Sequence, residues 1–505
     1  MRLKIDKGIK FRGSSLFIKM VGDELEYLDV IKSFNCYYHK NKNMWELPKG
    51  AYKTILDKCR DCNIDIVGKI PKEFEDYLKL LNNYDKPLPE YQSKTIPYSY
   101  QMDSFLYSKN HTKFLLADEQ GLGKTKQALD IAVSKKGQMK HCLIVCGVNE
   151  LKWNWVNEVA VHTSERAHIL GFKDGKIASV HDRLLDLQNK HDEFFLVTNI
   201  ETLRDTKIQE YIKILCTCGV IGMTIIDEIH KCKNSTSIQG KAIHCCCSYY
   251  KLALTGTPIM NAAIDLYNVL KWLEVENHSL TQFKSHYCIM GGFGGYQVVG
   301  YKHLDELQSR LDKYMLRRKK EDVLDLPPKI YTNEILEMDN GQTKLYKEVE
   351  QTIQDNIDKI LLLPNPLTAL IRLRQATGNP DILTSQSVNS VKYKRMVEIV
   401  YEVVNNGGKV IIFSNWAKVI EPATKLLEKY NPACITSQVK DKDKLLKEFK
   451  ENPKCKVILG TIGCLGTGFT LNEANTVIFL DEPFTSADKQ QAEDRCHRIG
   501  TKGTV

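Results

Sequence analysis

Short apolar runs alternate with amphipathic stretches in two successive blocks of this 505-residue chain, and this pattern restricts the fold more than any other feature. Runs that are apolar throughout are typical of parallel strands buried on both faces of a sheet. The first block contains such runs at 114–117, 142–146, 194–197 and 223–226. The second block contains runs at 409–413, 457–460 and 477–480. The pattern predicts an α/β fold with two tandem lobes, each built on a parallel sheet.

Prolines and composition divide the chain further. Residues 1–75 are rich in aromatic, lysine and β-branched residues and predict a small α+β accessory domain. Residues 76–97 are polar and contain Pro87, Pro89 and Pro97, which is typical of a linker. The paired prolines after Leu326 separate a first lobe, residues 98–326, from a second lobe, residues 327–505.

Composition excludes several classes of protein. With 43% hydrophobic and 26% charged residues, the chain is neither disordered nor collagen-like. No uncharged stretch is long enough to span a bilayer, and residues 1–7 lack the apolar core of a signal peptide. The 16 cysteines then fit free thiols in a reducing compartment. We expect an intracellular protein with no membrane partner, in the cytoplasm or nucleoid of a bacterial host or in a eukaryotic nucleus.

A glycine-rich segment, Gly121-Leu122-Gly123-Lys124-Thr125, lies between an apolar run and a helical stretch. Strand, glycine turn and helix start form the context of a phosphate-binding loop. Lys124 would reach the β- and γ-phosphates, and the Thr125 hydroxyl would bind Mg²⁺. The usual loop begins with glycine, whereas this one has Asp118 at that position. Taken alone, the segment also fits a simple turn.

Two carboxylates, Asp227 and Glu228, follow the apolar run at 223–226, and His230 comes two residues later. In open α/β sheets, ligands bind at the carboxyl ends of the strands. Asp227 would hold Mg²⁺, and Glu228 would activate the attacking water, because phosphoryl transfer depends on positioning and charge stabilisation. The alternative is a strand that ends in a charged turn.

Together these motifs resemble those of the SWI/SNF (sucrose-nonfermenting) family of superfamily-two helicase-like ATPases. The resemblance covers the chain from about residue 98 to its end. The matching segments, in family order, are 118–125, 227–230, 254–258, 314–323 with 326–329, and 490–500.

The resemblance implies two RecA-like lobes that bind ATP with Mg²⁺ and close during hydrolysis. Gln101 would contact the adenine edge, and Arg495 and Arg498 would act as arginine fingers on the γ-phosphate. The remaining nucleotide-binding positions that it implies are Asp118, Gly121, Gly123, Lys124, Thr125, Gly466 and Gly468.

The family resemblance also implies a DNA-dependent ATPase that translocates on double-stranded or branched DNA. Contacts to DNA phosphates would carry no sequence specificity and would weaken with salt. The tryptophan in this set fits core packing better than base stacking. Candidate contact residues are Lys152, Trp153, Thr198, Asn199, Ser414, Asn415 and Thr461.

Several alternatives stay open. Residues 29–32 and 37–48, with Tyr52, are similar to the HARP-type accessory domain of annealing helicases, which would favour fork regression or strand annealing; the aromatics could equally form a small core. A DNA-binding protein without ATP turnover is the alternative outside the enzymes. Cys59 and Cys62 form a C-x₂-C pair without a matching second pair nearby, so a structural zinc site is not expected. Because the chain stops five residues after Gly500, we expect either a fragment or a compact variant; protein partners are not indicated.

Overall fold

The computed structural model describes most of residues 90–497 and short parts of residues 1–89. The described parts of residues 1–89 are 2–6, 16–21, 37–39, 41, 44–47, 65–67, 84 and 88. Within 90–497 it omits 148–150, 174–175, 178, 257–261, 293, 295–296, 326, 328, 357–367, 385–389, 440 and 467–470. The chain divides into two compact units, Met1–Leu116 with Thr125–Leu316, and Ala117–Lys124 with Arg317–Val505. Each unit is described by itself.

The N-terminal region contains a five-stranded sheet with the order β3-β4-β2-β1-β5. Its neighbours are antiparallel except for the parallel pair β1 and β5. The Tyr38 ring lies 4.8 Å from the Trp45 ring across β3 and β4. Residues 29–32, Tyr52, Cys59 and Cys62 lie outside the described residues. The strands are β1 (Arg2–Asp6), β2 (Leu16–Val21), β3 (Tyr37–His39), β4 (Met44–Leu47) and β5 (Asp65–Val67).

The first lobe is built on a seven-stranded sheet with the order β16-β6-β13-β12-β7-β11-β8, in which all neighbours are parallel. The runs predicted at 114–117, 142–146, 194–197 and 223–226 correspond to β6, β7, β11 and β12. The strands are β6 (Lys113–Leu116), β7 (His141–Cys146), β8 (Ala167–Ile169), β11 (Phe195–Asn199), β12 (Ile221–Ile226), β13 (Tyr250–Leu254) and β16 (Met315–Leu316). Every residue of β7, β11, β12 and β13 is buried, as expected for a sheet covered on both faces.

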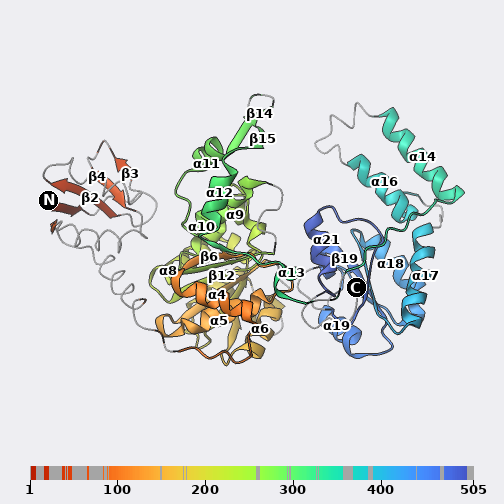
Figure 1. Ribbon diagram of the computed structural model, residues 1–505, viewed down its shortest axis with the longest axis horizontal. Helices are drawn as coiled ribbons and strands as arrows, with labels where there is room; N and C mark the ends of the chain where they lie inside the picture. Colours follow the sequence, from red (N-terminus) through yellow and green to blue (C-terminus); the bar gives the residue numbers. More distant parts are fainter. Residues whose placement is uncertain are drawn as a thin grey trace. The chain divides into compact units, whose positions relative to one another are not determined.

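Helices flank this sheet (Figure 1). They are α4 (Ser99–Asn110), α5 (Lys124–Ser134), α6 (Leu151–His162), α7 (Val180–Gln188), α8 (Thr206–Thr217) and α9 (Ile238–Ala242). A small pair, β9 (Phe172–Lys173) and β10 (Lys176–Ile177), lies between β8 and α7.

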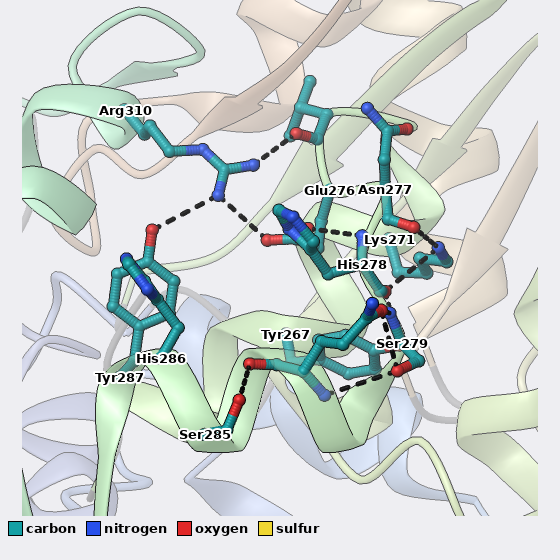
Figure 2. Close-up of polar contacts among 12 residues, drawn as sticks. Tyr267, Lys271, Glu276, Asn277, His278, Ser279, Ser285, His286, Tyr287 and Arg310 are labelled. Carbon is teal, nitrogen blue, oxygen red and sulfur yellow. Dashed lines mark hydrogen bonds and ion pairs between the residues drawn. The ribbon is translucent and has the colours of Figure 1, made fainter. Parts of the chain in front are cut away.

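A helical insertion separates β13 from β16 in the chain. It comprises α10 (Leu266–Trp272), α11 (Leu280–Tyr287), the hairpin β14 (Cys288–Gly291) and β15 (Gln297–Tyr301), and α12 (Leu304–Leu311). Figure 2 shows its polar centre, the buried carboxylate of Glu276. Glu276 accepts hydrogen bonds from Arg310 at 2.9 Å and from the His278 backbone N–H at 2.8 Å. These contacts join α12 to the segment after α10.

The second lobe has a parallel four-stranded sheet with the order β18-β19-β17-β20. Successive residues of β17 enter different cores: Ile411 and Phe413 pack on one face, and Val410 and Ile412 on the other. The strands are β17 (Val410–Ser414), β18 (Ala433–Ile435), β19 (Val457–Thr461) and β20 (Thr476–Phe479). The predicted fold class, two tandem α/β lobes with parallel sheets, is confirmed.

The helices of the second lobe include a pair, α14 and α16 (Figure 1). The Gln342 side chain of α14 donates to the Ala376 carbonyl of α16 at 3.1 Å. The helices are α13 (Lys320–Val323), α14 (Asn340–Asp355), α16 (Thr368–Gly378), α17 (Val391–Asn405), α18 (Ala417–Leu426), α19 (Lys442–Glu451), α20 (Ile462–Leu465) and α21 (Ser486–Glu493). Among the described residues, no helix has both the length and the apolar character needed to cross a membrane.

The cysteines of the described part of the chain are free thiols. Burial raises the pKa of the Cys142 and Cys146 thiols, which lie on β7 in the core of the first lobe. Such thiols are inert packing groups.

Candidate nucleotide-binding site

The glycine-rich loop leaves the carboxyl end of β6 and enters α5. Gly121 has φ of 88° and Gly123 has φ of 71°, a left-handed backbone region that side chains rarely adopt. The Lys124 Nζ donates to the backbone carbonyls of Asp118 at 2.7 Å and Glu119 at 3.2 Å. The lysine therefore folds back over the loop, with its charge held against the loop carbonyls.

Asp118, two residues after β6, is fully buried and paired with an arginine. The Arg318 Nε donates to its Oδ1 at 3.0 Å, and the Nη2 donates to its Oδ2 at 2.7 Å. Arg318 lies two residues after β16, whose Leu316 pairs with Leu116 of β6. The strand pairing thus brings Arg318 to the start of the loop. In this structure both carboxylate oxygens of Asp118 accept hydrogen bonds from Arg318.

Glu119 connects the loop to two further segments. Its backbone N–H donates to the Arg318 carbonyl at 3.0 Å. Its carboxylate accepts from the Lys320 backbone N–H at 2.7 Å and from the Gln490 side chain at 2.8 Å. Arg318, Lys320 and Gln490 were individually unassigned in the sequence, although each lies in a segment that resembles a family motif.

The two carboxylates of the second motif follow β12. Asp227 accepts from the Trp155 Nε1 at 3.0 Å on Oδ2 and from the Glu228 backbone N–H at 3.0 Å on Oδ1. Glu228 has φ of 50° and ψ of 48°, a left-handed conformation that is uncommon outside glycine. Such a conformation costs about 1–3 kcal/mol and concentrates at functional sites. Thr125, the second residue of α5, is half-buried.

His230 joins the Glu228 turn to the end of the neighbouring strand. Its Nδ1 lies 3.2 Å from the Glu228 Oε2 and 3.0 Å from the Thr255 Oγ1. Thr255 follows β13, which pairs with β12. One imidazole ring therefore lies between the Thr255 hydroxyl and the Glu228 carboxylate.

Gly147 allows the close approach of the Glu228 turn to β7. A Cβ at this position would lie 2.8 Å from the Glu228 Cβ and 3.3 Å from the Asp227 carbonyl oxygen. Its only sequence signal was a glycine directly after a buried run.

Gln101 is buried in the first turn of α4. Its Oε1 accepts from the Tyr98 backbone N–H at 3.1 Å. One turn later, the Ser104 hydroxyl donates to the Gln127 side chain of α5 at 2.7 Å. Gln101 thus lies in the first turn of a helix that is hydrogen-bonded to the helix after the glycine-rich loop.

In the second lobe, Arg495 is buried and 2% exposed. Its Nε donates to the carbonyls of Gly466 at 2.9 Å and Gln491 at 3.1 Å. Arg495 and Gly466, predicted to serve the same nucleotide, are therefore brought together. Arg498 and Gly468 lie outside the described residues.

The predicted DNA contacts of the first lobe differ in exposure. Trp153 is 43% exposed, so the expectation that it packs in the core is wrong, whereas Lys152, Thr198 and Asn199 are buried. Burial and the nearby charge of Arg183 lower the pKa of Lys152. Asn199 accepts from the Thr202 backbone N–H at 3.3 Å.

The predicted contacts of the second lobe lie at the carboxyl end of its sheet. Ser414 is buried and donates to Asp481, which also accepts from the Asn415 backbone N–H at 2.9 Å. Thr461, the last residue of β19, is half-buried and precedes α20.

Residues 90–382 match the SNF2-related domain, and residues 391–500 match the helicase conserved C-terminal domain. The chain belongs to the SNF2-related family. This match confirms the predicted resemblance to the SWI/SNF family and agrees with the RecA-like lobes described above.

Individual relatives align over most of this chain. A Mycoplasma pneumoniae protein named Uncharacterized ATP-dependent helicase is 27% identical over 473 residues, which cover 86% of this chain and 43% of that protein. The TATA-binding protein-associated factor MOT1 of Saccharomyces cerevisiae is 24% identical over 482 residues, covering 79% of this chain and 25% of MOT1. The ATP hydrolase class predicted from the motifs agrees with the name of the first relative.

Among solved structures, the Sulfolobus solfataricus SWI2/SNF2 ATPase core in complex with dsDNA is 26% identical, with a TM-score of 0.41. The match covers 83% of this chain and 89% of that chain. This chain spans less than half the length of the curated relatives that it matches.

Proposed function

We propose that this SNF2-related chain is a DNA-dependent ATPase that translocates on double-stranded or branched DNA. One observation carries the proposal: the glycine-rich loop leaves β6, and Asp227 and Glu228 leave β12, at the carboxyl edge of one parallel sheet. This edge is where open α/β sheets bind their ligands.

The donors at this edge fit ATP and Mg²⁺. The N-terminus of α5 and the Lys124 ammonium favour phosphate. The Thr125 hydroxyl and the Asp227 carboxylate are the hard oxygen ligands that Mg²⁺ prefers. The Trp155 side chain and the Glu228 backbone N–H donate to different oxygens of Asp227 and so hold its carboxylate in place. When bound, Mg²⁺ would neutralise charge on the transferred phosphoryl group.

Glu228 would orient the attacking water, with His230 fixing its carboxylate. Gln101 would select adenine, and Arg495 and Arg498 would stabilise charge on the γ-phosphate. Two backbone carbonyls hold the Arg495 Nε, so its terminal guanidinium nitrogens would make the phosphate contact. A cation supplied by the second lobe on closure would couple hydrolysis to lobe movement.

For DNA, the exposed Trp153 and the half-buried Thr461 would make direct contacts. The buried Lys152, Thr198, Asn199 and Ser414 would position neighbouring backbone, as Ser414 and Asn415 do around Asp481. The net charge of +9 suits phosphate binding without sequence specificity. A DNA substrate implies action in the bacterial nucleoid or cytoplasm, or in a eukaryotic nucleus.

A second function, fork regression or strand annealing, is favoured by one observation in the N-terminal sheet. Tyr38 is 38% exposed beside the Trp45 ring, and an exposed aromatic ring can stack on unpaired bases. A preference for forked over duplex DNA, lost in Tyr38→Ala, would support this function.

Two variants test the ATPase assignment directly. Glu228→Gln keeps the shape of the side chain, so we expect ATP affinity within a few-fold of wild type but turnover lower by roughly 100-fold. Lys124→Ala removes the phosphate contact and lowers ATP affinity itself. Wild-type turnover in Glu228→Gln would contradict the assignment, and DNA binding without turnover by the wild-type chain would favour a binding protein.

A further inference from the structure

Two histidines and an aspartate converge at the edge of the first-lobe sheet, away from the glycine-rich loop in the sequence. His168 lies on the edge strand β8, Asp186 near the end of α7, and His191 in the segment after α7. One ligand atom from each lies within 4.8 Å of the other two. Among the described residues, these three side chains form the group of histidine, cysteine or carboxylate ligand atoms that lie close enough together to hold one metal ion.

We propose that His168, Asp186 and His191 form a structural site for a divalent metal of the zinc type. Two imidazoles and a carboxylate are a ligand set that Zn²⁺ accepts. Donor atoms around tetrahedral Zn²⁺ lie about 3.4 Å apart, given Zn–N bonds of about 2.0–2.1 Å. The Asp186 carboxylate lies 2.9 Å from the His168 Nε2 and 3.8 Å from the His191 Nε2. These distances bracket the required spacing.

Outer contacts already orient the proposed ligands. The Gly171 backbone N–H donates to the Asp186 Oδ2 at 2.7 Å and fixes the carboxylate. The His191 Nδ1 lies 4.0 Å from the Glu193 carboxylate, while its Nε2 contacts the Asp186 backbone carbonyl at 2.7 Å. Metal binding would replace this carbonyl contact, and a shift of Glu193 toward Nδ1 would then give the carboxylate–histidine pairing that is typical of metal-bound histidine. A water molecule completes four-coordination.

A bound metal would connect α7 and the segment after it to β8, the edge strand of the first-lobe sheet. Strand β8 has three residues and pairs only with β11 among the described strands. The side chains are 28% (His168), 20% (Asp186) and 9% (His191) exposed, so an ion has access from solvent. Arg183 of α7 donates to the Thr202 hydroxyl at 3.3 Å, next to the predicted DNA-binding residue Asn199. By holding α7 in place, the metal would thus stabilise the segment that contains Asn199 and Thr202.

The test uses the whole chain, stripped with EDTA and kept reduced, and titrated with Zn²⁺ by calorimetry and with Co²⁺ by absorption. We expect one equivalent bound, a tetrahedral Co²⁺ spectrum without a thiolate charge-transfer band, and a Zn²⁺-dependent rise in Tm. His191→Gln and Asp186→Asn should weaken binding by roughly 10- to 100-fold and abolish the Tm rise.

His286→Gln is the matched control, because His286 also faces a carboxylate, Glu306 at 2.9 Å, but lies outside the cluster. It should bind as wild type does. Because His191 lies outside the helices and strands, its variant should fold even if Asp186→Asn does not. Absence of binding, a thiolate band, or unchanged affinity in His191→Gln would overturn the proposal.

Discussion

Arg318 donates to both carboxylate oxygens of Asp118, from Nε at 3.0 Å and from Nη2 at 2.7 Å. Bidentate pairs of this kind fix geometry as well as charge. Asp118 opens the glycine-rich loop, and Lys124 donates to its backbone carbonyl. The pair therefore determines where the loop begins, and it explains an aspartate at a position where glycine is usual.

Replacement of Arg318 should weaken ATP binding, although Arg318 itself is not a predicted nucleotide-binding residue. In Arg318→Ala the Asp118 charge stays buried without this partner, which costs about 3–5 kcal/mol. We expect at least a roughly 10-fold loss of ATP affinity, measured by titration with a fluorescent ATP analogue in the absence of DNA. Arg318→Lys should recover only part of it, because lysine lacks the planar fork. The adjacent, exposed Arg317→Ala is the control, and equal losses in both variants would refute a specific role for Arg318.

Gly147→Ala should lower turnover more than ATP affinity. The new methyl group would lie 2.8 Å from the Glu228 Cβ, so the Glu228 turn must move. A displacement of about 1 Å at a catalytic group can cost roughly 100-fold in rate. Steady-state kinetics should show a lower kcat with KM for ATP little changed. Gly463→Ala, where nothing lies within 4 Å of the added methyl group, should leave kcat as in wild type.

The sequence predicts those features of this molecule that depend on neighbouring residues. Continuous apolar runs identified β7 and β12, and the glycine-rich loop was recognisable because strand, turn and helix are contiguous. Features that depend on distant residues were not predicted. Strand β16 has two residues and pairs with β6, so the contact of Arg318 with Asp118, 200 residues earlier in the sequence, was not predicted although Arg318 lies in a recognised motif. Ser414 likewise donates a hydrogen bond to Asp481, which is 67 residues later in the sequence, so this contact had no local signal.

His230 and Thr255 should act as one unit in catalysis. His230→Ala removes the imidazole ring beside Glu228, and Thr255→Val removes the hydroxyl that contacts this ring. We expect each to reduce DNA-stimulated turnover, and the double variant to lose little more than the worse single variant. The cycle should yield a coupling of about 1 kcal/mol from the kcat values. Thr255→Ser, which keeps the hydroxyl, should behave as wild type, whereas additive losses would contradict the connection.

Glu276 should make the stability of the first lobe depend on acid pH. Burial raises its pKa, but the His278 N–H and the Arg310 charge (Figure 2) outweigh this effect, so the pKa lies below the ordinary 4.5. The ionised carboxylate therefore stabilises the fold above pH 4.5, and this contribution disappears as pH falls through the folded-state pKa. Glu276→Gln should lose roughly 2 kcal/mol at neutral pH, and less below pH 4.5.

Thermal unfolding measured from neutral to acid pH tests this expectation. The exposed Glu306→Gln serves as control, since Glu306 pairs with His286 on the surface of the same insertion. A Tm difference between wild type and Glu276→Gln that stays constant down to the lowest pH would show that the Glu276 charge is not responsible.

The most direct test of the central claim is ATP turnover by the wild-type chain without DNA and with single strands, duplex or a model fork, at fixed salt. Duplex or forked DNA should raise the rate well above the DNA-free value, more salt should reduce the effect, and Glu228→Gln should be roughly 100-fold slower than wild type with every DNA. Turnover that no DNA changes, or that persists undiminished in Glu228→Gln, would contradict a DNA-dependent ATPase working through this site.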